Sequence, residues 1–169
     1  MIYAGIGSRE TPEHILVKME NIAFYLAQHH TAVLRSGGAI GADSAFETGC
    51  DKAEGEKEIF YAKDWQNKIK PSKEAWKEAE RIASTIHPAW DRCSEYAKKL
   101  HSRNCFQILG ADLNSPVEFV VCYAKEDSNG NPQGGTRTAI MLARECNISV
   151  YNLFVPGRTE DLRKLVIRQ

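Results

Sequence analysis

Short apolar runs alternate with longer amphipathic stretches along the 169 residues of this chain. Apolar runs bounded by turn residues predict five strands, at residues 1–7, 32–35, 57–62, 117–123 and 148–153. Apolar positions at three- and four-residue spacing predict helices that start near residue 12 and cover 41–52, 73–86, 90–109, 136–146 and 160–167. We therefore expect an α/β fold: a single Rossmann-like domain over residues 1–169, with a parallel sheet of about five strands and helices on both faces.

Individual residues mark where several of these elements begin and end. Thr11 is a candidate N-cap of the first helix, with Pro12 at its first helical position. Pro88 ends the helix at 73–86, and we expect the apolar face of that helix, which carries Trp76 and Ile82, to pack in the core. The polar segment 125–133 is the best candidate for a mobile loop.

Glycine turns follow three of the predicted strands. They are Gly5-Ile6-Gly7-Ser8-Arg9 after the first, Ser36-Gly37-Gly38 after the second and Gly134-Gly135-Thr136 after the fourth. Glycine lets backbone N–H groups close on a ligand, and the N-terminus of the following helix favours phosphate. All three turns belong at the carboxyl edge of a parallel sheet, where ligands bind. Together they predict a site for a nucleotide or another phosphorylated small molecule.

Each turn alone also has a structural explanation, because any parallel α/β sheet needs tight connections. The fragment Gly5-Ile6-Gly7 does not complete G-x-G-x-x-G, since Glu10 takes the place of the third glycine, and no G-x-x-x-x-G-K-[ST] occurs. These absences argue against an ordinary dinucleotide enzyme and against a P-loop NTPase.

Charge and cysteine usage narrow the class of protein further. Lys and Arg number 22, as do Asp and Glu, so no global field draws the chain onto nucleic acid. No apolar run approaches the roughly 18 residues of a membrane span, and the first residues do not form a signal peptide, so we expect a soluble cytoplasmic protein with no membrane partner. The five cysteines lack a C-x-x-C pair and indicate buried free thiols. The histidines show no ligand spacing with them, so we expect no metal and no cofactor.

In these glycine turns and their order, the chain resembles the DprA/Smf-like branch of a larger superfamily. That superfamily also includes the Lonely guy and lysine-decarboxylase-like phosphoribohydrolases. The matching pieces occur in order over roughly residues 1–157, at 5–9, 36–43, 102–104, 134–139 and 150–152. The resemblance implies a pocket for phosphate-bearing ligands. DprA-like proteins act on single-stranded DNA, and other superfamily members hydrolyse nucleoside monophosphates or sense nucleotide signals.

Polar side chains beside the turns complete the predicted site. The arginines Arg9, Arg35, Arg103 and Arg137 can bind phosphate bidentately, although each alone also suits a solvated or helix-capping position. Hydroxyl groups near the turns can donate to phosphate or cap helices, and Asp43 either holds a ribose hydroxyl or complements a helix dipole. The expected ligand contacts are Gly7, Ser8, Arg9, Ser36, Gly37, Gly38, Asp43, Arg103, Asn104, Gly134, Gly135, Thr136, Arg137 and Thr138.

One departure from the phosphoribohydrolase pattern bears on activity. That pattern, P-G-G-x-G-T-x-x-E, ends in a glutamate that takes part in bond cleavage, whereas Met141 stands at this position here. The oxocarbenium-like transition state needs a nearby carboxylate, which leaves Glu47 or Asp43 for that role.

The favoured function is therefore a nucleotide- or phosphosugar-binding protein, acting as a sensor, a sequestering protein or an accessory factor in nucleic-acid metabolism. One alternative is a nucleoside 5′-monophosphate N-glycosidase. The other is a DprA-like protein that binds single-stranded DNA and needs a homo-oligomer to build a continuous basic groove.

Overall fold

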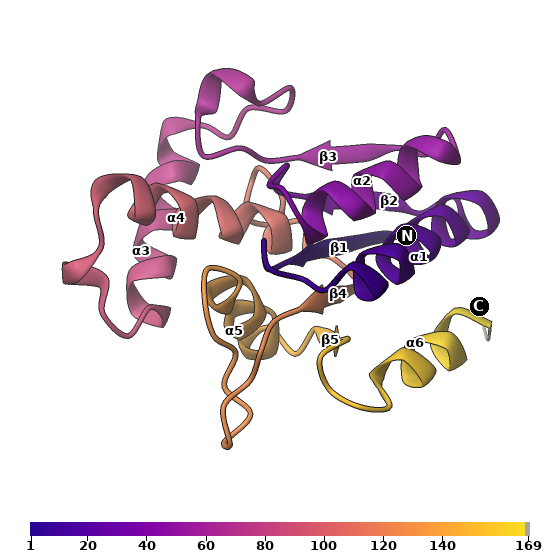
Figure 1. Ribbon diagram of the computed structural model, residues 1–169. Helices are drawn as coiled ribbons and strands as arrows, with labels where there is room; N and C mark the ends of the chain where they lie inside the picture. Colours follow the sequence, from indigo (N-terminus) through magenta and orange to yellow (C-terminus); the bar gives the residue numbers. More distant parts are fainter. Residues whose placement is uncertain (168–169) are drawn as a thin grey trace.

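Five parallel strands form the centre of the fold, in the order β3-β2-β1-β4-β5 (Figure 1). This computed structural model describes residues 1–167. The strands are β1 (Ile2–Gly7), β2 (Val33–Ser36), β3 (Lys57–Ile59), β4 (Phe119–Tyr123) and β5 (Ser149–Asn152). All neighbouring strands pair in parallel, which confirms the predicted Rossmann-like α/β sheet. The strand order reverses between β1 and β4, and the candidate site described below lies beside this position.

Helices cover both faces of this sheet (Figure 1). They are α1 (Glu13–His30), α2 (Ala42–Lys52), α3 (Lys73–Ile86), α4 (Glu95–Leu109), α5 (Arg137–Glu145) and α6 (Arg158–Ile167), with 3₁₀ turns η1 (Asp64–Gln66) and η2 (Trp90–Arg92). Side chains of α1, α2 and α6 pack with Phe119 and Val121 on one face. Side chains of α3, α4 and α5 pack with Val120 and Cys122 on the other. Alternate residues of β4 therefore serve two cores, as expected of a strand buried on both sides.

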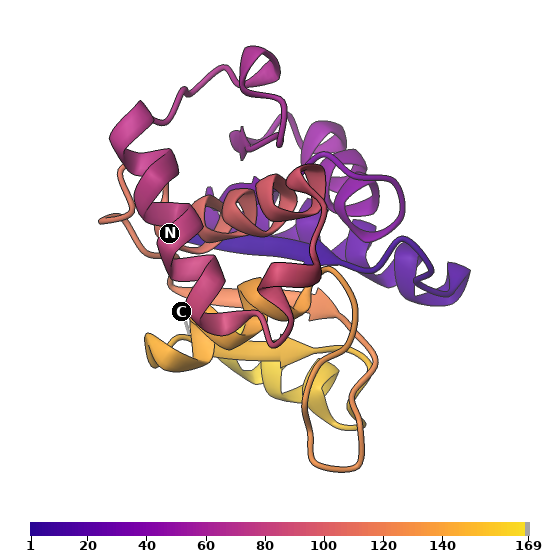
Figure 2. The same cartoon turned by 90° about the vertical axis from the view of Figure 1, so that its left-hand side faces the viewer.

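The connection between β4 and α5 extends away from the sheet as a narrow hairpin, visible from both directions (Figures 1 and 2). Glu126 and Pro132 form an antiparallel bridge at its base. At its tip, one carboxylate oxygen of Asp127 accepts hydrogen bonds from the backbone N–H groups of Asn129 and Asn131, at 2.8 and 2.9 Å. The predicted loop at 125–133 is thus a hairpin whose tip is built around an aspartate, a common turn device.

The predicted start of the first helix is wrong by one position. Helix α1 begins at Glu13, with Pro12 as the residue before it. Thr11 does not cap the helix, because its hydroxyl donates instead to the carbonyl oxygen of Ser8 at 2.7 Å. The hydroxyl therefore holds the turn after β1, close to the predicted site.

Two other predicted elements are shorter in the structure. Strand β3 ends at Ile59 instead of residue 62, and Tyr61 N–H donates to the side chain of Asn67 at 2.7 Å, which turns the chain away from the sheet. The helix predicted at 90–109 begins only at Glu95, where Ser94 accepts a capping hydrogen bond from Ala97 N–H at 3.2 Å. The residues before it form η2, so the chain reverses direction before α4 starts.

The cysteines are free thiols, as the sequence predicts. Cys50, Cys105 and Cys122 are buried, whereas Cys146 is exposed at the end of α5, so the prediction of a buried thiol is wrong there. Cys93 is half-buried in the turn before α4. In the part of the chain that the structure describes, no helix combines the length and the apolar character needed to cross a membrane.

Candidate functional site

A cleft of about 420 Å³ opens beside the point where the strand order reverses between β1 and β4. In open parallel sheets, ligands bind at this position, outside the carboxyl ends of the strands. The turn after β1, the start of α2, one side of α4 and the glycine turn before α5 form the walls of the cleft. Segments that are far apart in the sequence thus meet where the sequence analysis expects a ligand.

Asp43, in the first turn of α2, ties two of the predicted turns together. Its Oδ1 accepts from Gly7 N–H at 3.2 Å, and its Oδ2 accepts from Ala39 N–H at 3.3 Å. Burial raises the pKa of Asp43 to about 6, while the charge of Arg103 and the two N–H groups act in the opposite direction. A buried carboxyl group with a shifted pKa in a cleft is typical of functional sites.

Arg103, on α4, lines the cleft and also holds the turn after β2. Its Nη1 donates to the carbonyl oxygens of Gly37 and Phe60. A Cβ atom at Gly37 would come within 1.8 Å of this nitrogen, so glycine is needed for the guanidinium to approach the backbone. The Nε atom of Arg103 is buried and has no hydrogen-bond partner among the described residues.

Arg9 supplies a second positive charge to the cleft. It follows β1 and is exposed to solvent. Within residues 1–167, no carboxylate forms an ion pair with it. Burial lowers the pKa of Arg103, and the nearby charge of Arg9 lowers it further, against the opposing effect of Asp43. Two guanidinium groups on one cleft offer charged hydrogen-bond donors to an anion, alongside the carboxyl groups of Glu10 and Asp43.

The glycine turn before α5 leaves backbone open to the cleft. A Cβ atom placed at Gly134 or Gly135 would have no other atom within 4 Å. Gly134 has a φ of +77°, in the left-handed region that favours glycine. Thr136 is the N-cap of α5, but its side chain makes no capping hydrogen bond. The N–H group of Arg137, the first residue of α5, donates to the carbonyl oxygen of Gly134 at 3.2 Å, and the Thr136 side chain caps no N–H group at this helix start.

The structure brings most of the predicted contact residues to this cleft. Those that line it are Gly7, Ser8, Arg9, Asp43, Arg103, Asn104, Gly134, Gly135 and Thr136. Ser8 is well placed to donate, because its Oγ accepts from Glu10 N–H at 3.1 Å and its own hydroxyl hydrogen remains available.

The other predicted contact residues, Ser36, Gly37, Gly38, Arg137 and Thr138, lie outside the lining. The buried hydroxyl of Ser36 donates to the carbonyl oxygen of Gly5 at 2.6 Å, and Gly38 packs against Tyr61. Arg137 donates to the carbonyl oxygen of Pro132 at 3.3 Å. These residues therefore stabilise the turns and do not face the cleft.

Two further charged candidates also serve the fold. Arg35 is buried and pairs with Glu58 at 2.7 Å. Glu47, one of the two predicted carboxylates for catalysis, does not line the cleft and accepts from Lys57 Nζ at 3.2 Å. Asp43 is thus the candidate carboxylate that the structure places in the cleft.

Sequence reasoning missed His101 as a lining residue. It faces the cleft from α4, and its Nδ1 lies 2.8 Å from the hydroxyl oxygen of Thr138. Burial, together with the charges of His87 and Arg103, lowers the pKa of His101 to about 4. The imidazole is therefore neutral at physiological pH. Its position two residues before Arg103 does not reveal this role, because helical residues two apart point in different directions.

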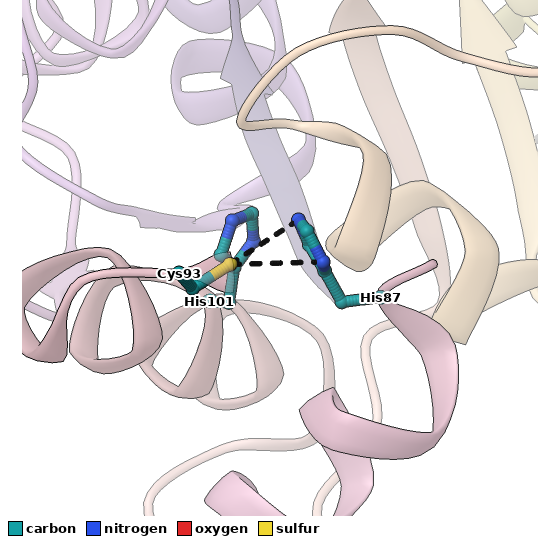
Figure 3. A group of neighbouring side chains, drawn as sticks. All are labelled: His87, Cys93 and His101. Atoms are coloured by element: carbon teal, nitrogen blue, oxygen red, sulfur yellow. Dashed lines mark hydrogen bonds between the residues drawn. The ribbon is translucent and has the colours of Figure 1, made fainter. Parts of the chain in front are cut away.

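A second feature that sequence reasoning missed lies beside His101. His87, Cys93 and His101 come together, with their candidate ligand atoms all within 4.8 Å of one another (Figure 3). Their spacing, H-x₅-C-x₇-H, matches no familiar ligand pattern, because the chain reversal at η2 brings them together. The sequence signal available was only the presence of these residue types around Pro88.

Comparison of the chain with known protein families, with curated proteins and with solved structures gave no match.

Proposed function

We propose that this protein binds a nucleotide or a phosphosugar in the cleft at the carboxyl edge of its sheet. The observation that carries the proposal is the pairing of Arg9, exposed and without an ion-pair partner among the described residues, with the buried Arg103 in the same cleft. Hydrogen bonds from guanidinium groups to phosphate oxygens are strong because both partners carry charge.

The backbone supports the same ligand class. The open turn at Gly134 and Gly135 offers main-chain groups that a phosphate can approach without meeting a side chain. The N-terminus of α5, which begins directly after this turn, adds a partial positive charge. Two arginines and one helix start, contributed by separate segments, favour a compact anion such as a phosphate group.

The remaining lining residues fit the uncharged part of a nucleotide. Glu10 at the rim and Asp43 inside the cleft are hydrogen-bond acceptors of the kind that hold ribose hydroxyl groups. Leu100 and Ala97 on α4 give apolar surface next to them. The resemblance to DprA/Smf-like proteins points to the same ligand class, and on this basis we propose a sensor, sequestering or accessory role in nucleic-acid metabolism.

The N-glycosidase alternative now depends on a single residue. Glu47 is held by Lys57 outside the cleft, so hydrolysis would require Asp43, whose oxygens already accept two backbone N–H groups. The carboxylate of the phosphoribohydrolase pattern is absent, since Met141 occupies its position. These contacts favour binding without cleavage.

A thermal-shift panel of nucleoside mono-, di- and cyclic phosphates and of phosphosugars tests the proposal. A ligand present at about 100 times its dissociation constant adds about 2.7 kcal/mol to the free energy of unfolding. We expect at least one phosphate-bearing compound to raise the melting temperature saturably. The absence of any shift at millimolar concentration across the panel contradicts the proposal.

A further inference from the structure

We propose that His87, Cys93 and His101 bind a Zn²⁺ ion at the edge of the cleft. The side chains point toward one another from the end of α3, the turn before α4 and α4 itself (Figure 3). Cys93 Sγ lies 3.7 Å from His87 Nδ1, and the centroids of the two imidazole rings are 4.4 Å apart. A tetrahedral zinc site with Zn–S near 2.3 Å and Zn–N near 2.0 Å separates its ligand atoms by about 3.5 Å. Small side-chain rotations therefore bring the three atoms to one ion.

The fold fixes these three residues before any ion arrives. His87 ends α3, where its N–H donates to the carbonyl oxygen of Ala83 at 2.9 Å. Cys93 closes η2 through a 3.0 Å hydrogen bond from its N–H to the carbonyl oxygen of Trp90. Ser94 then caps α4, which carries His101. Because each ligand sits at a hydrogen-bonded helix end or within a helix, little backbone entropy is lost when the ion binds.

The hydrogen bonds leave a nitrogen of His101 for the metal, whereas on His87 the metal displaces a backbone N–H donor. His101 Nδ1 lies 2.8 Å from the hydroxyl oxygen of Thr138, which leaves Nε2 as its ligand atom. His87 Nδ1 accepts from Ala89 N–H at 3.1 Å, so its neutral ring carries the proton on Nε2 and has its lone pair on Nδ1. His87 Nδ1 lies 3.7 Å from Cys93 Sγ. When the metal binds, the lone pair of this nitrogen coordinates the cation and no longer accepts from Ala89 N–H. A second-sphere partner such as Thr138 orients a metal-bound histidine.

The ligand types select the metal. One thiolate and two imidazoles, with no carboxylate in the group, suit Zn²⁺ and not Mg²⁺ or Ca²⁺, which prefer oxygen ligands. Binding releases the thiol proton of Cys93, since the thiolate is the ligand. Three protein ligands leave the fourth tetrahedral position open, the arrangement of zinc sites that bind a water or an exogenous ligand. Because His101 also lines the cleft, the ion lies at the cleft wall.

This inference replaces the expectation from sequence spacing that the chain holds no metal. It does not depend on nucleotide binding, and its test is carried out in the absence of any nucleotide. Metal-free, reduced protein is titrated with Co²⁺ and then with Zn²⁺. We expect one Co²⁺ per chain, visible absorption of a four-coordinate ion, a near-ultraviolet thiolate-to-cobalt band, and loss of both signals when Zn²⁺ displaces Co²⁺.

Matched variants identify the ligands. Cys93→Ser abolishes the thiolate band, whereas Cys146→Ser, at an exposed cysteine outside the group, keeps it. His87→Gln and His101→Gln lose tight binding, whereas His14→Gln, at an exposed histidine on α1, does not. Thr138→Val, a change of similar volume, keeps the spectrum and weakens affinity by about 10- to 100-fold, the effect of losing an outer-sphere partner.

Circular dichroism of every variant checks that the fold is intact. The proposal is overturned if the wild-type protein shows no thiolate-to-cobalt band, if the band persists in Cys93→Ser, or if Zn²⁺ fails to displace Co²⁺. Absence of the band in the wild-type protein, or failure of Zn²⁺ to displace Co²⁺ there, overturns the proposal even where a variant does not fold.

Discussion

Asn104 donates a hydrogen bond from its Nδ2 atom to the carbonyl oxygen of Gly135, over 2.7 Å. The donor belongs to α4 and the acceptor to the turn before α5, so one side chain joins two walls of the cleft. The same helix carries Arg103, which holds the turn after β2 in the same way. Helix α4 therefore positions two of the three glycine turns that the sequence singles out.

A methyl group at Gly135 should interfere with binding and not with folding. A Cβ atom there meets no other atom within 4 Å, and Gly135 does not have a positive φ, so Gly135→Ala should change the free energy of unfolding by less than about 1 kcal/mol. The methyl projects from a residue that lines the cleft, where it obstructs an approaching phosphate. We expect weaker nucleotide affinity, measured by calorimetry. Ser128→Ala, at an exposed position of the same loop, is the control and should bind like the wild type.

Arg9 is the cleft cation that can be removed without disturbing the fold, because it is exposed and has no ion-pair partner among the described residues. Arg9→Gln should weaken nucleotide binding by about 1.5–3 kcal/mol, the range for a hydrogen bond to a charged group, or roughly 10- to 150-fold. Titration calorimetry gives this ratio. The control is Arg163→Gln, at an exposed arginine on α6. Equal losses in both variants would show a general charge effect and contradict a contact at Arg9.

Asp43 should make stability depend on pH in a direction opposite to that of a salt-bridged carboxylate. Burial raises its pKa from the ordinary 3.8 to about 6, so the folded chain keeps this proton to a higher pH than the unfolded chain does. Its contribution is complete below about pH 4 and is lost as the pH rises through 6, by about 3 kcal/mol in total.

Urea denaturation between pH 4 and 7 measures this effect as the difference between the wild type and Asp43→Asn, which cancels the contributions of other groups. The wild type should lose stability relative to the variant as the pH rises. A difference that stays constant, or that grows with pH, contradicts the assignment of a raised pKa.

Salt dependence separates a mononucleotide pocket from a surface that tracks DNA. A protein that neutralises several phosphates of a single strand loses affinity steeply with salt, with a log–log slope of about 0.7 per phosphate. Because the net charge is zero and the cleft holds two arginines, we expect weak binding of a labelled oligonucleotide, with a dissociation constant of tens of micromolar or more, on the order of non-specific values. Fluorescence anisotropy at low and moderate salt measures both quantities. Submicromolar affinity with a slope of several phosphates would favour the DNA-binding alternative.

The sequence predicts the sheet well because each strand and helix carries its own local signal. Helix α3 has the predicted bounds, since Ser72 caps its start and Pro88 follows its end. Strand β4 is recognised from its continuous apolar run, which a strand buried on both faces requires. The errors fall where a tertiary or side-chain contact decides the boundary, as where Asn67 draws the chain away after β3.

The site is less predictable than the fold, because a side chain beside a glycine turn can face either the ligand or the protein. Arg103 and Arg35 look equivalent in sequence, yet Arg103 lines the cleft while Arg35 is buried against Glu58. The spacing of His87, Cys93 and His101 in the sequence does not indicate a metal site, since the group depends on the chain reversal at η2. Residue type thus indicates which chemistry is available, and the three-dimensional contacts decide which residues form one site.

Titration calorimetry of a 5′-mononucleotide and its matching nucleoside, on the same preparation, tests most directly whether the cleft recognises phosphate. We expect saturable binding of the nucleotide at one site and an affinity for the nucleoside that is lower by about tenfold or more, because the nucleoside cannot contact Arg9 and Arg103 through charged hydrogen bonds. Equal affinities for the two compounds, or no heat of binding from any phosphate-bearing ligand at millimolar concentration, would contradict the account.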